Sequence, residues 1–242
     1  MAFNVDLTLP PDFSNRVKLF PLPNVVLFPG VMQGLHIFEP RYRQMMQDAL
    51  ADDQLITMAS LQPPRGGEDE QSYFLRPDIF QTVCIGKIVT HSRTDDGKYN
   101  LLLVGAKRAR IVEEIVSDKA YRVAEVEILE DVRDVTDLEL ADLRNQLIGE
   151  FKTFASQRQG LSEQTLKNML VDTMPFSVLI DLICYASGLD TLDQVKVLET
   201  TETGRRCELV LGFLREKMNK PPMDEMPRPD DLGDFPPNFS LN

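Results

Sequence analysis

The pattern of apolar and polar positions changes near residue 130. Before this point, short segments of alternating and β-branched residues are separated by Pro, Gly and Asp clusters, a pattern typical of strands and turns. After it, apolar residues recur every three or four positions, as on the buried face of a helix. The sequence therefore predicts an α+β chain whose β-rich part, residues 16–130, precedes a helical part, residues 131–219.

In the β-rich part, the predicted strands are short and numerous. They are Asn24–Phe28, Gly34–Phe38, Leu55–Leu61, Phe80–Thr90, Asn100–Gly105, Arg108–Glu114 and Tyr121–Leu129. The Asp96-Gly97 pair predicts a hairpin, and Pro40 is suited to the first turn of a single inserted helix. Residues 62–72 are polar and rich in Pro and Gly, which predicts an exposed loop. Strands of this kind most economically close into a small barrel.

The helical part is predicted to be a bundle of four or five helices. Five segments carry helical spacing or helix start signals: Leu140 to Phe154, a helix opened by Ser162, Pro175 to Gly188, a short helix from Asp190 or Thr191 to Glu199, and Thr203 to Met218. Residues 1–15 form an N-terminal extension. Residues 220–242 hold six of the chain's prolines, which predicts a flexible tail.

Charge and composition restrict the class of protein. The 242 residues include 26 basic and 38 acidic ones, a net charge of −12, and residues 1–130 carry 14 against 18, a net charge of −4. An acidic surface repels phosphate, so nucleic acid is a disfavoured partner. The sequence has no run of 18 or more apolar residues, so no membrane span is predicted. The N-terminus does not resemble a secretory signal. Three widely spaced cysteines fit a reducing compartment, so we expect a cytoplasmic protein.

Motifs for catalysis and cofactor binding are absent from the sequence. It contains neither a phosphate-binding Gly-rich loop nor a Gly-x-Ser-x-Gly elbow. The two histidines, His36 and His91, are interpreted as packed or surface residues, and Cys84 and Cys184 as small core residues. Neither these residues nor Cys207 have neighbours at metal-ligand spacing. We therefore expect no catalytic residue, no metal and no cofactor.

The segment from Leu19 to Leu50 is the one unusual constellation, because four prolines precede a sudden change to a charged helical pattern. Glu39 stands between a strand and a helix, beside Arg41 and Arg43. The interpretation we favour is that Glu39 caps the helix and fixes this corner. The alternative is a direct ligand contact, and the candidate peptide-binding residues are then Phe38, Glu39, Arg41, Tyr42 and Arg43.

Three motifs in this order resemble the Lon N-terminal domain, the substrate-recognition module of the ATP-dependent protease Lon. The first is Pro21-Leu22 followed by Val25-Val26-Leu27-Phe28-Pro29-Gly30 and the apolar segment Leu35–Phe38. The second is a hairpin motif with Gly86, Asp96-Gly97, Gly105, Arg108 and Ile111. The third is the segment from Phe176 to Leu214 in the helical half. The resemblance covers about residues 16 to 218. The Phe-Glu-Pro-Arg-Tyr sequence at Phe38–Tyr42 resembles stand-alone Lon-domain proteins more closely than full-length proteases.

The resemblance implies a PUA-like β-barrel followed by a helical bundle. In the family, this unit recognises unfolded or tagged substrates and helps to assemble the protease. The sequence stops before an ATPase or Ser/Lys protease module would begin, so we expect no enzyme activity from this chain.

Two functions of different classes remain open at this point. The first is a non-catalytic polypeptide-binding module for protein quality control, or an adaptor, that binds unfolded polypeptides and works with a protease or chaperone. Its apolar groove would lie between barrel and bundle, with edge pairing of the bound segment. The alternative is a PUA-like protein that binds RNA or a small ligand. The sequence does not specify the oligomeric state.

Overall fold

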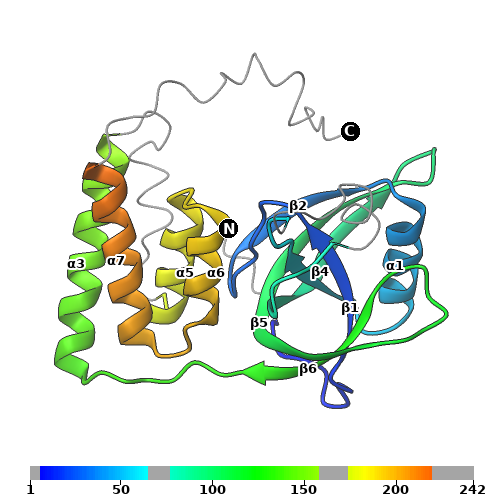
Figure 1. The fold of residues 1–242 in the computed structure, drawn as a ribbon, viewed down its shortest axis with the longest axis horizontal. Helices are drawn as coiled ribbons and strands as arrows, with labels where there is room; N and C mark the ends of the chain where they lie inside the picture. The colour runs from blue at the N-terminus through cyan, green and yellow to red at the C-terminus, as the bar shows by residue number, and fades with distance from the viewer. Residues whose placement is uncertain (1–5, 65–76, 158–173, 220–242) are drawn as a thin grey trace.

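In the computed structural model, which describes residues 6–64, 77–157 and 174–219, a β-barrel and a group of helices lie side by side (Figure 1). The helices α3, α5, α6 and α7 are grouped on one side of the barrel, and α1 lies on the other. Their bounds are α1 Pro40–Ala51, α3 Asp137–Ser156, α5 Phe176–Ala186, α6 Thr191–Glu199 and α7 Thr203–Asn219. The predicted α+β class, with a barrel followed by helices, is confirmed.

Six strands form the sheet in the order β2-β5-β4-β3-β1-β6, and β6 also pairs with β5. Their bounds are β1 Arg16–Leu22, β2 Met32–Ile37, β3 Leu55–Ser60, β4 Thr82–Arg93, β5 Tyr99–Ile115 and β6 Val123–Leu129. The additional pairing closes five strands into a ring. Strand β5 makes this possible because its first part pairs with β2, its last part pairs with β6, and β4 runs along its other edge.

The predicted strand Asn24–Phe28 is wrong, because the first strand is β1 and this segment joins no ladder. Asn24 has a φ of 55°, which turns the chain out of the strand direction after Leu22. Val26, Leu27 and Phe28 are nevertheless at most 2% exposed. Their apolar run reflects burial beside the barrel and not strand pairing, since a short apolar run alone does not distinguish the two.

The two segments predicted as Asn100–Gly105 and Arg108–Glu114 form a single strand, β5. Between the two segments, the pairing of β5 with β4 shifts by one residue, because Ile85 pairs with Lys107 and Gly86 with Gly105. The apolar alternation of the sequence breaks at the same place. A β-bulge of this kind bends a strand without ending it. The predicted helix at Ser162 and most of the predicted loop 62–72 lie outside the described residues.

Helix α1 is confirmed, and Pro40 occupies its first turn. Tyr42, Met45, Met46 and Ala49 point inward at helical spacing and are at most 6% exposed. The ring of Tyr42 meets that of Phe20 edge-on at 4.7 Å between centroids. This packing fixes α1 against the barrel.

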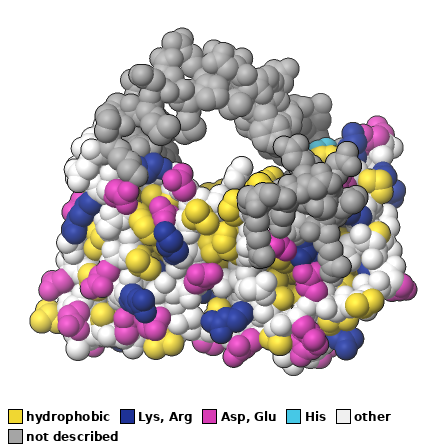
Figure 2. Space-filling view, viewed as in Figure 1, with side chains coloured by type: hydrophobic (Ala, Val, Ile, Leu, Met, Phe, Trp, Pro, Cys, Tyr) yellow, Lys and Arg dark blue, Asp and Glu magenta, His cyan; other side chains and the backbone are white. Residues whose placement is uncertain are grey.

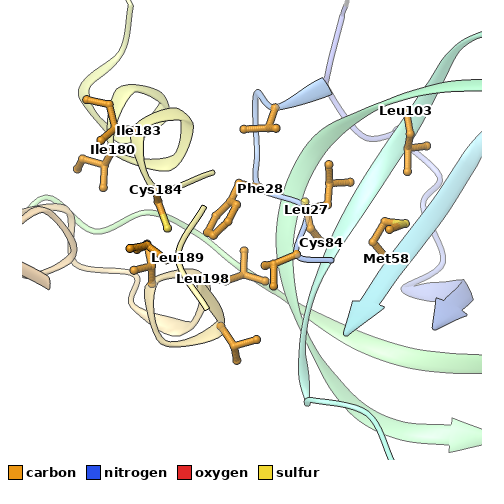
Figure 3. Close-up of a cluster of buried hydrophobic side chains, with 14 of the residues drawn as sticks. Leu27, Phe28, Met58, Cys84, Leu103, Ile180, Ile183, Cys184, Leu189 and Leu198 are labelled. Atoms are coloured by element: carbon orange, nitrogen blue, oxygen red, sulfur yellow. The ribbon is translucent and has the colours of Figure 1, made fainter. Parts of the chain in front are cut away.

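One hydrophobic core runs from the barrel into the helices. Figure 3 shows Phe28 between Leu27 and Cys84 on the side of the barrel, and Cys184 of α5 and Leu189 of the loop after it on the side of the helices. A separate apolar cluster that includes Leu19, Val83 and Ile85 packs together in the barrel. Phe28 is fully buried at the boundary, so its side chain belongs to the core shared by the barrel and the helices.

The turn Pro29-Gly30 sits directly against α5. A β carbon on Gly30 would stand 2.6 Å from Cγ1 of Val178, and Gly30 has a φ of +78°. Both the backbone conformation and the close approach require glycine here. The Phe-Pro-Gly motif therefore positions the helices on the barrel.

Candidate binding surfaces at the barrel corner and the junction

The corner between β2 and α1 holds the five predicted site residues. Phe38 is 58% exposed, and its ring stacks on that of His36 with centroids 6.1 Å apart. Glu39 is the residue before the helix, and its carbonyl oxygen accepts from the amides of Tyr42 and Arg43. Its side chain makes no capping hydrogen bond and instead pairs with Arg41 at 2.8 Å. Glu39 thus marks the helix start through its backbone.

Tyr42 and the two arginines of this corner have different surroundings. Tyr42 is 6% exposed, and burial raises the pKa of its hydroxyl. The Arg41 guanidinium lies 4.7 Å from the centre of the Tyr42 ring, a cation–π contact. Arg43, half-buried, extends towards the turn between β4 and β5, where it approaches Gly97. Of the five residues, Phe38 and Arg41 offer the largest exposed surface.

The junction of barrel and helices contains a hollow of about 600 Å³. From the barrel side it is lined by Pro23, Asn24, Leu61, Gln62, Pro63, Pro64 and Phe80, and from the helical side by residues 189–192. Leu192 is 51% exposed. Figure 2 shows hydrophobic side chains over the middle of one face, where the two parts of the molecule meet. Sequence reasoning expected an apolar groove in this region without identifying these residues.

The hollow and the corner are separate surfaces. The hollow lies at the junction, whereas α1 and the corner lie on the side of the barrel away from the helices (Figure 1). None of the five corner residues lines the hollow.

A cluster of four charged residues, three of them buried, joins the two halves. Nη2 of Arg108 on β5 donates to both carboxylate oxygens of Asp181 on α5, at 2.5 and 2.6 Å. Nη1 of Arg108 and Nη1 of Arg206 on α7 both donate to Oδ1 of Asp131, at 3.1 and 2.7 Å. Nε of Arg108 donates to the carbonyl oxygen of Leu198. The two arginines and two aspartates balance in charge.

Burial and the neighbouring arginines act in opposite directions on the pKa values of the two aspartates. Burial raises the pKa of Asp181, and the positive charges of Arg108 and Arg206 act against this rise. Burial also acts to raise the pKa of Asp131, but the hydrogen bond from Arg206 and the charges of both arginines outweigh it, so its pKa is lowered. The side chains of Arg108, Arg206 and Asp181 are at most 2% exposed. These three side chains form a buried structural connection, and Asp131, whose side chain is 32% exposed, lies at its solvent side.

Sequence reasoning identified Arg108 only as a motif position and missed Asp131, Asp181 and Arg206. A signal was present, because Asp181 is the one charged residue in the apolar helix α5. A charge on such a helix is retained only when it is paired.

The described ranges contain neither a cluster of metal-ligating side chains nor a helix that could span a membrane. No group of three or more His, Cys, Asp or Glu residues among residues 6–64, 77–157 and 174–219 could hold a metal ion. No helix of the described chain has the length and apolar character needed to cross a membrane. Cys84, Cys184 and Cys207 are free and buried, and burial raises the pKa of each thiol.

The molecule consists of a closed barrel, an attached helical group and a hollow at their junction. Residues 16–216 match the model of the ATP-dependent protease La (LON) substrate-binding domain, and the chain belongs to this family. The resemblance drawn from the three sequence motifs is confirmed.

Full-length proteases are among its relatives. The chain is 25% identical over 207 residues to Lon protease of Dictyoglomus thermophilum, a match that covers 86% of this chain and 25% of the relative. It is 26% identical over 208 residues to Lon protease of Roseiflexus castenholzii, with 86% and 25% covered. The chain thus spans about a quarter of the length of these curated relatives.

Solved structures show the same fold. The N-terminal domain of Mycobacterium avium complex Lon protease superimposes with a TM-score of 0.60 at 19% identity, over 83% of this chain and 98% of that one. A Lon N-terminal domain protein from Xanthomonas campestris gives 0.57 at 22% identity, over 82% and 98%.

Proposed function

We propose that this chain is a non-catalytic module that binds unfolded or partly folded polypeptides, and that the junction hollow is where it holds them. The observation that supports this most strongly is the family match over residues 16–216, which is to a substrate-binding domain. The proposal extends to a role as an adaptor in protein quality control, with a protease or chaperone as partner. It also places the chain in the cytoplasm, since three free cysteines suit a reducing compartment.

The composition of the hollow supports a polypeptide ligand. Its volume falls within the range of about 300–1,000 Å³ that is usual for binding sites. Leu61, Phe80 and Leu192 supply apolar contact, while Asn24 and Thr191 place polar groups at the same surface. An extended segment could bury apolar side chains here and keep its backbone groups hydrogen-bonded to these polar residues and water.

Binding of an unfolded client tests the proposal. The probe is a fluorescently labelled small protein, reduced and alkylated so that it cannot refold, and the readout is anisotropy. We expect Leu192→Asp to weaken binding about tenfold or more, because a carboxylate would be desolvated against the apolar segment. Leu138→Asp is the matched control, since Leu138 is 74% exposed on α3 away from the hollow, and it should bind as wild type does.

Two further measurements separate the alternatives. No binding of several unfolded clients by the wild-type chain would refute the proposal. Binding of a labelled RNA at low salt, lost as salt rises and without polypeptide binding, would favour the PUA-like RNA reading instead. Peptidase activity should be absent with and without ATP.

A further inference from the structure

Two arginines from different elements converge on the turn between β4 and β5. Nη1 of Arg43, on α1, lies 3.4 Å from the point where a β carbon on Gly97 would stand, and Nη2 of Arg93, on β4, lies 3.6 Å from it. The two nitrogens are therefore no more than 7.0 Å apart, the sum of these distances. The Arg93 guanidinium lies 5.8 Å from the centre of the Tyr99 ring, a cation–π contact.

Neither guanidinium has an ion-pair partner in the described part of the chain. Two carboxylates of the same region pair with other residues, Glu39 with Arg41 and Asp96 with Lys98. Asp95 is exposed and forms no ion pair with either arginine within the described residues. Two like charges held close together repel each other, and an anion between them would remove that repulsion. This arrangement is notable in a chain with a net charge of −12.

We propose that Arg43 and Arg93 form a carboxylate-binding site at the barrel corner, and that its ligand is an acidic side chain or the C-terminal carboxylate of a bound polypeptide. Each oxygen of one carboxylate accepts from a guanidinium at about 2.8 Å, so a single carboxylate can bridge the two arginines. The site lies apart from the junction hollow. It rests on the proposed function in one respect, namely that the carboxylate belongs to a bound polypeptide.

The neighbourhood of the arginines defines the ligand further. Ile37 pairs with Tyr99, and Tyr99 with Arg93, so the exposed Phe38 lies one residue beyond this row of the sheet. Phe38 stacks on His36 and so faces the other side of the sheet, which leaves the carboxylate itself as the group that the two arginines recognise. The carboxylates of Glu39, Asp95 and Asp96 would repel the repeated phosphates of a nucleic acid, which makes a single carboxylate the better match.

Three labelled peptides that differ in one charge test the site by anisotropy. The first has a Phe next to an Asp and an amidated C-terminus, the second has Asn in place of Asp, and the third is the Asn peptide with a free C-terminal carboxylate. We expect the first or third to bind wild type at least fivefold more tightly than the second. The double variant Arg43→Ala/Arg93→Ala should lose this preference, while still binding the amidated Asn peptide as wild type does.

The matched control is Arg16→Ala/Arg110→Ala, which removes two exposed arginines of the barrel and changes the net charge equally. It should keep the preference, and loss of the preference in this control would show a general charge effect and overturn the site. Equal binding of all three peptides to wild type would overturn the site and leave the proposed function standing. Failure of every peptide and every unfolded client to bind would overturn both. A labelled RNA whose binding depends on Arg43 and Arg93 would overturn the choice of a carboxylate.

Discussion

Arg108 and Asp181 are 73 residues apart in sequence, and Nη2 of Arg108 lies 2.5 and 2.6 Å from the two carboxylate oxygens of Asp181. Their side chains are 2% and 1% exposed. The pair connects β5 of the barrel to α5 of the helical part. Because water and salt do not reach it, this pair is screened much less than a surface pair.

Asp181→Ala should lower the free energy of unfolding by about 3–5 kcal/mol, because removing one partner of a buried pair leaves an uncompensated charge. Urea unfolding followed by circular dichroism measures this. The double variant Arg108→Met/Asp181→Leu should recover part of the loss, since apolar residues can replace a buried pair. Asp137→Ala is the control, because its ion pair with Arg133 is exposed and contributes little. A small effect at Asp181 would contradict the assigned role.

Gly105→Ala should destabilise the protein by about 3 kcal/mol or more, since an added β carbon would stand 2.0 Å from the carbonyl oxygen of Phe28. The backbone cannot move aside easily, because the amide of Gly105 donates to Val31 and its carbonyl accepts from Gly30. Thermal and urea unfolding report the loss. Gly34→Ala provides the comparison: nothing lies within 4 Å of that position, so its stability should match or exceed wild type. Equal behaviour of the two variants would refute the packing argument.

Asp131 should make stability depend on pH. Its pKa is lowered in the folded chain, because Arg206 and Arg108 outweigh the effect of burial. The folded state therefore binds a proton less readily than the unfolded one. This contribution is complete above the unfolded pKa of about 3.9 and is lost as the pH falls through the lower folded value.

Asp131→Asn removes this contribution while keeping the side-chain shape. The variant should be less stable than wild type at pH 7, and the difference between the two proteins should shrink as the pH falls below 4. Urea midpoints from pH 7 to pH 3 measure it. A difference that stays constant or widens at low pH would show that Asp131 does not act through its charge.

The three cysteines should be unreactive in the folded protein. Burial raises the pKa of all three thiols, that of Cys207 to about 12, and a buried neutral thiol is a poor nucleophile. Ellman's reagent should therefore modify none of them within minutes at pH 8, and all three after unfolding in guanidinium. Rapid modification of a single cysteine under native conditions would identify an opening of the core that the structure does not contain.

Much of the fold could be predicted from sequence because its signals are local. The spacing of Tyr42, Met45 and Met46 defines α1, and Asp96-Gly97 defines the hairpin between β4 and β5, whose turn is closed by a hydrogen bond from Gly97 to Thr94. The segment Asn24–Phe28 shows where local signals end. An apolar run indicates only that the residues are buried. The contact of Phe28 with the helical part depends on Cys184 and Leu189, which are far away in sequence.

The sites were harder to predict for the same reason. Phe38 and Arg43 are close in sequence, so local reasoning could name both as candidates, whereas Arg93 approaches Arg43 only through the sheet register. Asp131, Asp181 and Arg206 come from three separate segments, so pairing among them requires the tertiary arrangement. A single acidic residue in an apolar helix indicates that a partner exists without saying where it is.

The pairing of strand β5 determines how its backbone amides can exchange with solvent. Strand β5 has neighbouring strands on both edges, β4 on one and β2 or β6 on the other, over most of its length. Exchange of its backbone amides with solvent deuterium therefore requires the ring of strands to open, which amounts to global unfolding. Strand β2, at the open end of the strand order, can separate alone. Its amides should exchange first, and they report the fluctuations of the surface next to Phe38.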